Sequence, residues 1–150
     1  MKKIVLIILI FPMSILFGQH IVNFLGDTAE KAMLKWGDMQ LSSKRMPDGN
    51  TRLTFKEEGN NGHMQIEAYV NNNNRIVLVQ YGLATSHKQL RNDLLAYEYK
   101  YLIKNNYTAI EKGEYKWTFI NLHEHITCIL SIKDEPYGKY PHMVVISYGY

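Results

Sequence analysis

The sequence offers one pair of metal ligands at short spacing, His123 and His125 on either side of Glu124. Two histidines two residues apart on a strand face the same way, and together they could hold a zinc ion. A zinc site needs a third or fourth ligand, however, and the segment lies where the predicted strands 114–120 and 125–133 must be joined by a turn. This position favours a solvated turn over a metal site, so we predict no metal and no cofactor.

Cys128 is the only cysteine and therefore the only candidate thiol nucleophile. It alternates in phase with Ile126, Leu130 and Ile132 on the apolar side of a predicted strand, and no base is placed to deprotonate it. A buried small hydrophobic residue is the favoured interpretation. A single cysteine forms no disulfide within the chain, so the core or partner proteins must hold the fold together.

The carboxylate pairs Glu57-Glu58 and Asp134-Glu135 have the residue types of a general acid and base. Both pairs lie beside turn residues in polar surroundings, which favours ordinary exposed carboxylates. The serines lack the glycine-flanked turn of a hydrolase nucleophile, and no glycine-rich phosphate loop follows a predicted strand. We therefore predict no catalytic residue and no enzyme activity, although catalytic groups that are distant in sequence leave no local trace.

Residues 1–18 have the features of a secretory signal peptide. Two lysines precede about 14 apolar residues, and the small Gly18 follows near a plausible cleavage position. An uncleaved anchor is the alternative, because a span continued through Leu25 approaches the ~20 residues needed to cross a bilayer. We expect cleavage, which leaves residues 19–150 as one periplasmic or secreted domain without a stable membrane span.

The charge of this domain is almost balanced. The whole chain has 17 basic and 14 acidic residues, and residues 1–18 contain two lysines but no acid. Fifteen basic residues therefore face 14 acidic ones in the mature chain, without a Lys/Arg-rich run. Nucleic acid is not expected as a partner, because a basic patch is missing.

Two stretches, 28–36 and 86–104, have the apolar spacing of helices. Capping boxes that begin at Asp27 and Ser86 predict where the two helices start. The buried stripe of the second helix is expected to contain Leu90, Leu94, Tyr97 and Tyr101.

Six further segments have the alternation or the continuous apolar character of strands. They are 51–56, 64–70, 76–81, 114–120, 125–133 and 142–148. Together with the helices they predict an α+β fold, in which an antiparallel sheet of about six strands carries two helices on one face.

The two halves of the chain are similar in sequence. Residues 52–55 match 116–119 at an offset of 64, and residues 76–82 match 143–149 at an offset of 67. A predicted helix precedes each set of three strands. We therefore predict a tandem αβββ repeat.

This layout resembles known exported proteins. The opening Phe-Leu-Gly-Asp-Thr at 24–28 and the Tyr-Lys-Trp-Thr at 115–118 resemble a group of small exported bacterial proteins of uncharacterised function. The order of elements is also similar to the β-lactamase inhibitor protein and to small outer-membrane assembly lipoproteins. Those families mostly bind proteins with a sheet face or edge, so the resemblance implies a binding function. The chain lacks the lipidated cysteine of the lipoproteins, and no binding residue is carried over from them.

These patterns predict a non-catalytic exported binding module that contacts another envelope or extracellular protein with its uncovered sheet face or its loops. A small-ligand or lipid-binding domain, with a pocket between helices and sheet, is the alternative. Tyrosine is typical of recognition surfaces, because it offers contact area with little loss of conformational entropy. The predicted binding residues are Arg52, Tyr69, Lys116 and Thr118.

Overall fold

The computed structural model describes residues 21–134 and 139–150. The helices are the short 3-10 helix η1 (Val22–Phe24), α3 (Ala29–Trp36) and α4 (Lys88–Lys104). The strands are β1 (Gln40–Arg45), β2 (Thr51–Glu58), β3 (Gly62–Val70), β4 (Ile76–Thr85), β5 (Thr108–Lys112), β6 (Lys116–Asn121), β7 (Ile126–Lys133) and β8 (His142–Gly149).

The predicted signal peptide, residues 1–18, lies outside the described ranges. Within them, no helix is both long enough and apolar enough to cross a bilayer.

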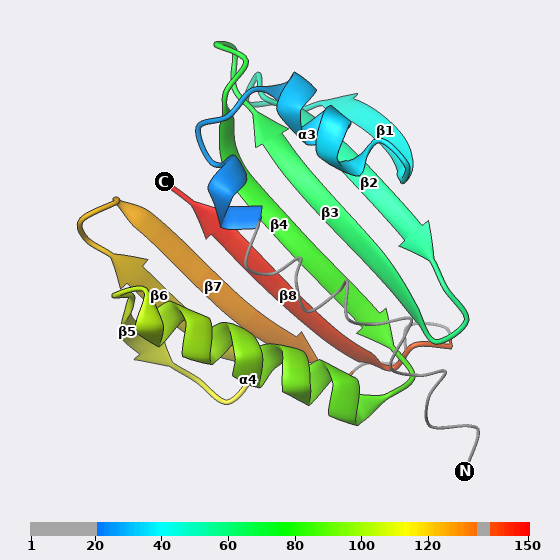
Figure 1. The fold of residues 1–150 in the computed structure, drawn as a ribbon, viewed down its shortest axis with the longest axis vertical. Helices are drawn as coiled ribbons and strands as arrows, with labels where there is room; N and C mark the ends of the chain where they lie inside the picture. The colour runs from blue at the N-terminus through cyan, green and yellow to red at the C-terminus, as the bar shows by residue number, and fades with distance from the viewer. Residues whose placement is uncertain (1–20, 135–138) are drawn as a thin grey trace.

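Eight strands form one antiparallel sheet in the order β1-β2-β3-β4-β8-β7-β6-β5 (Figure 1). The α+β class and the six predicted strands are confirmed, but the count of about six is wrong. The two additional strands, β1 and β5, are the edges of the sheet. All six residues of β1 and four of the five in β5 are exposed, so neither strand has the alternating apolar face by which a sequence pattern reveals a strand.

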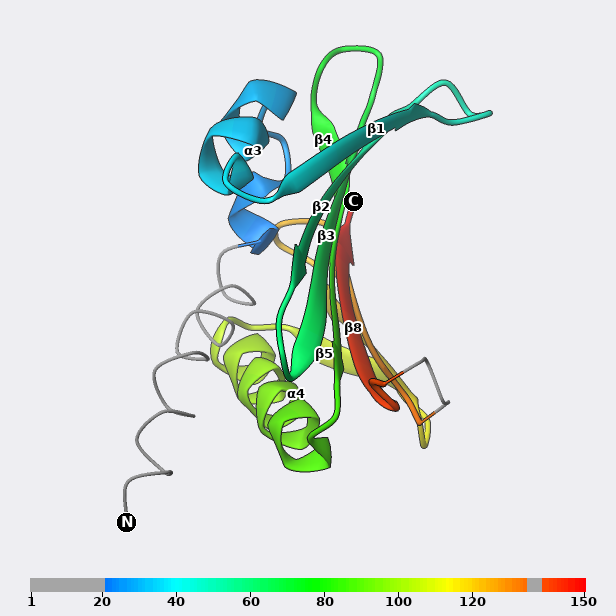
Figure 2. The same cartoon turned by 90° about the vertical axis from the view of Figure 1, so that its right-hand side faces the viewer.

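Both long helices lie on the same side of the sheet (Figure 2). In the described part of the chain no helix or strand covers the other side, which we call the open face. The alternation of β2 explains this asymmetry. Leu53 and Phe55 point toward the helices and are 2% and 0% exposed, whereas Arg52 and Lys56 point the opposite way.

Each long helix packs an aromatic side chain on a phenylalanine of the sheet. The ring of Trp36 in α3 lies edge-on to Phe55 of β2 at 5.3 Å between centroids, and Tyr99 of α4 lies edge-on to Phe119 of β6 at 5.4 Å. Edge-to-face contacts of this kind add to the stability gained by burying the rings themselves. The core between helices and sheet is therefore built from packed aromatic and aliphatic side chains.

The two halves of the sheet meet where β4 pairs with β8. Gln80 lies opposite Ser147, and the Ser147 hydroxyl donates a hydrogen bond to the Gln80 side-chain carbonyl at 3.1 Å. Helix α4 crosses over this pair, because it leaves β4 and returns the chain at the far edge as β5. β8, the last strand along the described chain, therefore lies in the interior of the sheet and not at its edge.

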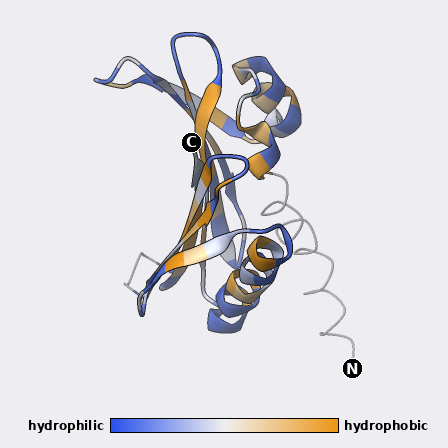
Figure 3. Cartoon of the chain, turned by 90° about the vertical axis from the view of Figure 1, so that its left-hand side faces the viewer, coloured by the Kyte–Doolittle hydropathy of each residue, from blue (hydrophilic) through white to orange (hydrophobic). Residues whose placement is uncertain are grey.

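The buried side of α4 differs from the predicted stripe. Of the four predicted positions only Leu94 is fully buried, and Figure 3 shows hydrophobic and hydrophilic residues intermixed along this helix. Leu90, Tyr97 and Tyr101 are only half-buried, and two charged residues that the predicted stripe does not contain are buried instead. The buried residues of α4 are Arg91, Leu94, Glu98 and Leu102.

The predicted capping boxes are also wrong. The N-cap residues are Thr28 and His87, and neither makes a side-chain capping hydrogen bond. The Asp27 carboxylate instead pairs with Lys31 at 2.9 Å, and the hydroxyl of Thr85 accepts a hydrogen bond from the backbone N–H of His87 at 3.1 Å.

Candidate functional site

The strand register places all four predicted binding residues on the open face. Arg52 lies opposite Tyr69 across the β2–β3 pair, while Lys116 and Thr118 lie on β6 in the other half of the sheet. Five strand spacings separate β2 from β6. At ~4.8 Å per spacing, the two groups are about 24 Å apart. The structure therefore brings the four residues onto one face, but into two separate clusters.

The first cluster is organised around Glu67, which lies on the open face but is not one of the four predicted binding residues. Its carboxylate accepts hydrogen bonds from Gln65 at 2.8 Å and from the Tyr69 hydroxyl at 3.1 Å, and it lies 3.5 Å from the Arg52 guanidinium. Glu67 is only 7% exposed, although it points away from the helices. A buried carboxylate needs such partners, because an unpaired charge is costly to remove from water. We call Arg52, Gln65, Glu67 and Tyr69 the Glu67 cluster.

Tyr69 is held in its donor state within this cluster. Burial is the largest cause that raises the pKa of Tyr69, and the nearby Glu67 carboxylate raises it further. The phenol therefore stays protonated at neutral pH and keeps its hydrogen bond to Glu67. The ring itself remains half-buried, so one side of it is available for contact.

The second cluster is smaller and more exposed. The Thr118 hydroxyl donates a hydrogen bond to the Glu111 carboxylate at 2.8 Å, and Lys116 lies 3.9 Å from the same carboxylate. The side chains of Lys116 and Glu111 are 54% and 60% exposed. This pair adds little to stability, since exposed ion pairs are screened by water.

A band of glycines, apolar side chains and the hydrogen-bonded polar pair Gln80–Ser147 lies between the two clusters. Gly82 and Gly149 contribute no side chain to it, and its apolar members are half-buried. The register places these members on β4, β6, β7 and β8 with their side chains on the open face. They are Leu78, Ile120, Ile129 and Val145.

The candidate metal ligands and carboxylate pairs of the sequence lie mainly in turns and at strand ends. His123, Glu124 and His125 are exposed in the turn between β6 and β7, which confirms the turn interpretation. Among residues 21–134 and 139–150, no group of three or more His, Cys, Asp or Glu residues is arranged to hold a metal ion. Glu58 pairs with His63 at 2.8 Å, and Glu135 of the second carboxylate pair lies outside the described residues.

Cys128 is completely buried on the helix side of β7, directly opposite Tyr148 of β8. Desolvation raises the pKa of the Cys128 thiol well above its usual value, and the Glu98 carboxylate raises it further. The thiolate form that a nucleophile requires is therefore suppressed. Cys128 is placed as a core residue, as its alternation predicts.

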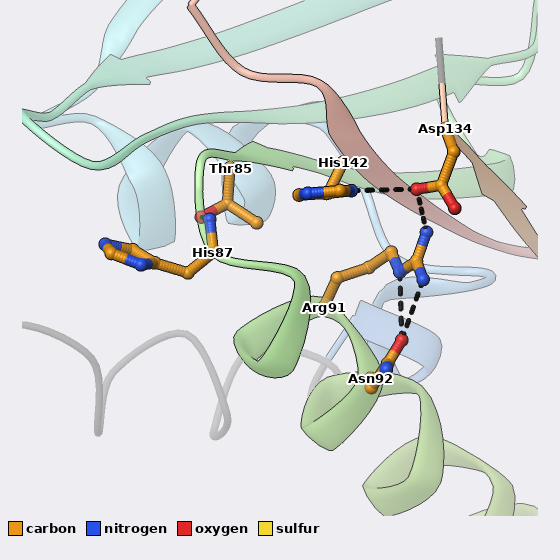
Figure 4. A network of polar contacts seen from close by, with 6 residues as sticks. All are labelled: Thr85, His87, Arg91, Asn92, Asp134 and His142. Atoms are coloured by element: carbon orange, nitrogen blue, oxygen red, sulfur yellow. Dashed lines mark hydrogen bonds and ion pairs between the residues drawn. The ribbon is translucent and has the colours of Figure 1, made fainter.

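A polar network at the start of α4 is a feature that the sequence pattern does not reveal (Figure 4). The Arg91 guanidinium, 3% exposed, pairs with Asp134 and donates a hydrogen bond to Asn92 at 2.9 Å. His142 lies 2.8 Å from the same Asp134 carboxylate, and this contact is the largest cause that lowers the pKa of Asp134. The network connects α4 to the end of β7 and the start of β8.

No protein family, curated protein or solved structure matches the chain.

Proposed function

We propose that this protein is a non-catalytic exported binding module that contacts another envelope or extracellular protein through its open face. The observation that carries the proposal is the Glu67 cluster, a set of hydrogen-bonded polar side chains that lies beside a band of mixed apolar and polar residues on an uncovered sheet. Nothing in the core needs to move for this face to be used, since both long helices pack on the opposite side.

Preorganisation supports the choice of this face. Side chains that are fixed before binding lose less conformational entropy when a partner arrives. Glu67 already holds Arg52 and Tyr69 in the free protein. Arginine and tyrosine are also among the residue types that most often dominate the energy of protein interfaces.

The dimensions of the face suit a protein partner. Eight strands at ~4.8 Å spacing and central strands of eight to ten residues give a surface on the order of 30 Å in each direction. An interface of standard size needs roughly 800 Å² from each partner, which such a surface can supply. The band supplies apolar contact area interrupted by the Gln80–Ser147 pair, and the two clusters supply polar groups on either side of it.

The predicted αβββ unit lacks one strand, because each long helix is followed by four strands. The repeated order of elements therefore supports a further proposal, a duplication of a helix followed by four strands. The matched segments fall on strands of the same rank, β2 with β6 and β4 with β8. Phe55 and Phe119 differ by the offset of 64, Tyr81 and Tyr148 by the offset of 67, and all four are completely buried.

The alternative of a lipid or small-ligand pocket between the helices and the sheet has less support. The centre of that interval holds the packed rings of Trp36, Phe55, Tyr99 and Phe119. It is hollowed at one end, beside the last turn of α4, by the cavity described below.

The test is photo-crosslinking in cells that export the protein. A photoreactive residue at position 69 or 116 should capture the same partner, while one at Leu34, 87% exposed on α3, should capture none. With the photoreactive residue at Thr127, the double variant Tyr69→Ala/Lys116→Ala should abolish capture and leave the melting temperature nearly unchanged.

A matched control removes a tyrosine and a lysine elsewhere. Tyr115 lies in the turn after β5, and Lys100 is an exposed residue of α4. Tyr115→Ala/Lys100→Ala should capture the partner as the wild type does. Equal capture from position 34, or undiminished capture by the open-face double variant, contradicts the proposal.

A further inference from the structure

A polar cavity of about 400 Å³ lies at the C-terminal end of α4, away from the open-face clusters. Its walls come from η1, from the last turn of α4 and the residues that lead to β5, and from the turn between β6 and β7. The cavity is at the lower end of the size range of ligand sites, about 300–1,000 Å³. It is large enough for one small ring.

Asn121 fixes the shape of this cavity. Its side-chain carbonyl accepts hydrogen bonds from the backbone N–H groups of His123 and Glu124 at 3.1 and 3.2 Å. Its amide nitrogen donates to the backbone carbonyl of Asn105 at 3.3 Å and to the Glu124 carboxylate at 3.4 Å. Asn121 is 6% exposed, so one buried amide joins the turn to the end of the helix.

The floor and the rim differ in character. Val22, Tyr107 and Ile126 line the cavity and are 8%, 5% and 7% exposed, which gives it a partly apolar floor. The Tyr107 ring is fixed edge-on against Tyr148, with 6.2 Å between centroids. The rim is polar and exposed. Its side chains are Asn23, Lys104, Asn106, His123 and Glu124.

The electrostatics disfavour an anionic ligand. Lys104 and Glu124 contribute one charge of each sign to the lining. The cavity also lies at the C-terminal end of α4, where the helix dipole is negative. Burial, followed by the Glu124 carboxylate, raises the pKa of Tyr107, so its hydroxyl stays protonated and can donate. The lining thus offers donors and acceptors together, without an excess of positive charge.

We propose that this cavity binds a neutral polyhydroxylated molecule of the size of one sugar ring. The hydroxyl groups of such a ligand both donate and accept, and so match amides, a carboxylate and phenols. Its C–H groups pack on the apolar floor formed by Tyr107, Val22 and Ile126. This site is independent of the open face, and either proposal can fail without the other.

The test is titration of the purified isotope-labelled protein with glucose, galactose and N-acetylglucosamine in turn, followed by amide chemical shifts. At least one sugar should give saturable shifts at Asn106, Tyr107, His123 and Glu124. Glu124→Ala should weaken binding about tenfold, since a hydrogen bond to a charged group is lost. The control Glu114→Ala, exposed in the turn after β5, should bind as the wild type does.

A second variant distinguishes a neutral ligand from a cationic one. Glu124→Gln retains an acceptor and can keep the bond to Asn121, so it should bind sugar within about threefold of the wild type. Putrescine and inorganic phosphate serve as charged probes. The proposal is overturned if no sugar gives saturable shifts at the cavity, if either charged probe saturates it in preference to sugar, or if Glu114→Ala weakens binding as much as Glu124→Ala.

Discussion

The hydroxyl group of Tyr148 in β8 donates a hydrogen bond to the carboxylate of Glu98 in α4, and both side chains are completely buried. The other carboxylate oxygen of Glu98 has no hydrogen-bond partner among the described residues. Desolvation dominates this site and raises the pKa of Glu98 to about 7. A titrating carboxyl therefore lies inside the helix–sheet interface.

Stability should consequently decrease as the pH rises from about 4.5 to about 7. Below this window Glu98 is protonated in both states. Within it the unfolded chain releases the proton while the folded protein retains it, so the free energy of unfolding falls by on the order of 3 kcal/mol. Glu98→Gln should remove this dependence and stabilise the protein at pH 8. Urea unfolding at several pH values measures the effect, with the exposed Asp93→Asn in the same helix as the control. A Glu98→Gln variant that keeps the wild-type slope would contradict the assignment.

The Arg91–Asp134 pair should respond asymmetrically to loss of either partner. Arg91 is buried, whereas 40% of the Asp134 side chain is exposed. Arg91→Met leaves a hydrated carboxylate and an apolar side chain of similar length, so the free energy of unfolding should stay within about 1 kcal/mol of the wild type. Asp134→Ala leaves a buried guanidinium with only Asn92 as a partner and should be the more damaging change. Chemical denaturation of both variants decides the order, and the reverse order would be inconsistent with the observed burial.

Phe55 and Phe119 should be of similar importance to the core. Each is completely buried and contacts an aromatic ring of the helix that covers its half. Replacement of either by alanine should cost about 3–5 kcal/mol, because each leaves a large cavity beneath a helix. Denaturant unfolding of the two variants measures this. A cost well below this range for one of them would mean that its half can collapse around the lost ring.

Cys128 should react with thiol reagents only when the protein unfolds. The side chain has no exposed surface, and burial raises the pKa of its thiol. At pH 8 the labelling rate should therefore follow the global unfolding rate and increase with urea. Mass spectrometry of iodoacetamide-treated protein gives the rate. Rapid labelling without denaturant would show that the helix-covered face opens locally.

The interior strands of the sheet can be predicted from the sequence, whereas the two edge strands cannot. Alternation along β2 and β6 predicts which residues face the helices, because a strand covered on one side must separate apolar from polar residues. In β1, Leu41 is itself 43% exposed, so no buried position imposes a period. The edge strands are held by backbone hydrogen bonds to β2 and β6. These bonds do not require particular side chains, so the sequence pattern does not reveal them.

Two further features cannot be predicted from the sequence pattern. They are the buried charges of helix α4 and the grouping of the binding residues on the open face. Glu98 and Arg91 are buried because Tyr148 and Asp134, both far along the chain, supply their partners. Alternation also places Arg52, Tyr69, Lys116 and Thr118 on one face, as predicted. Their division into two clusters depends on the insertion of β8 beside β4, and hydropathy along a single segment contains no information about that neighbour.

The position of β8 between β4 and β7 also has a consequence for the order of events during synthesis. The ribosome makes β8 after every other described strand, yet β8 joins the two halves of the sheet. Before His142 is translated, strands β1–β4 and strands β5–β7 have no shared neighbour through which to pair. The nascent chain also lacks the buried Val144, Ile146 and Tyr148. Cooperative folding of the whole sheet therefore waits for translation of this segment.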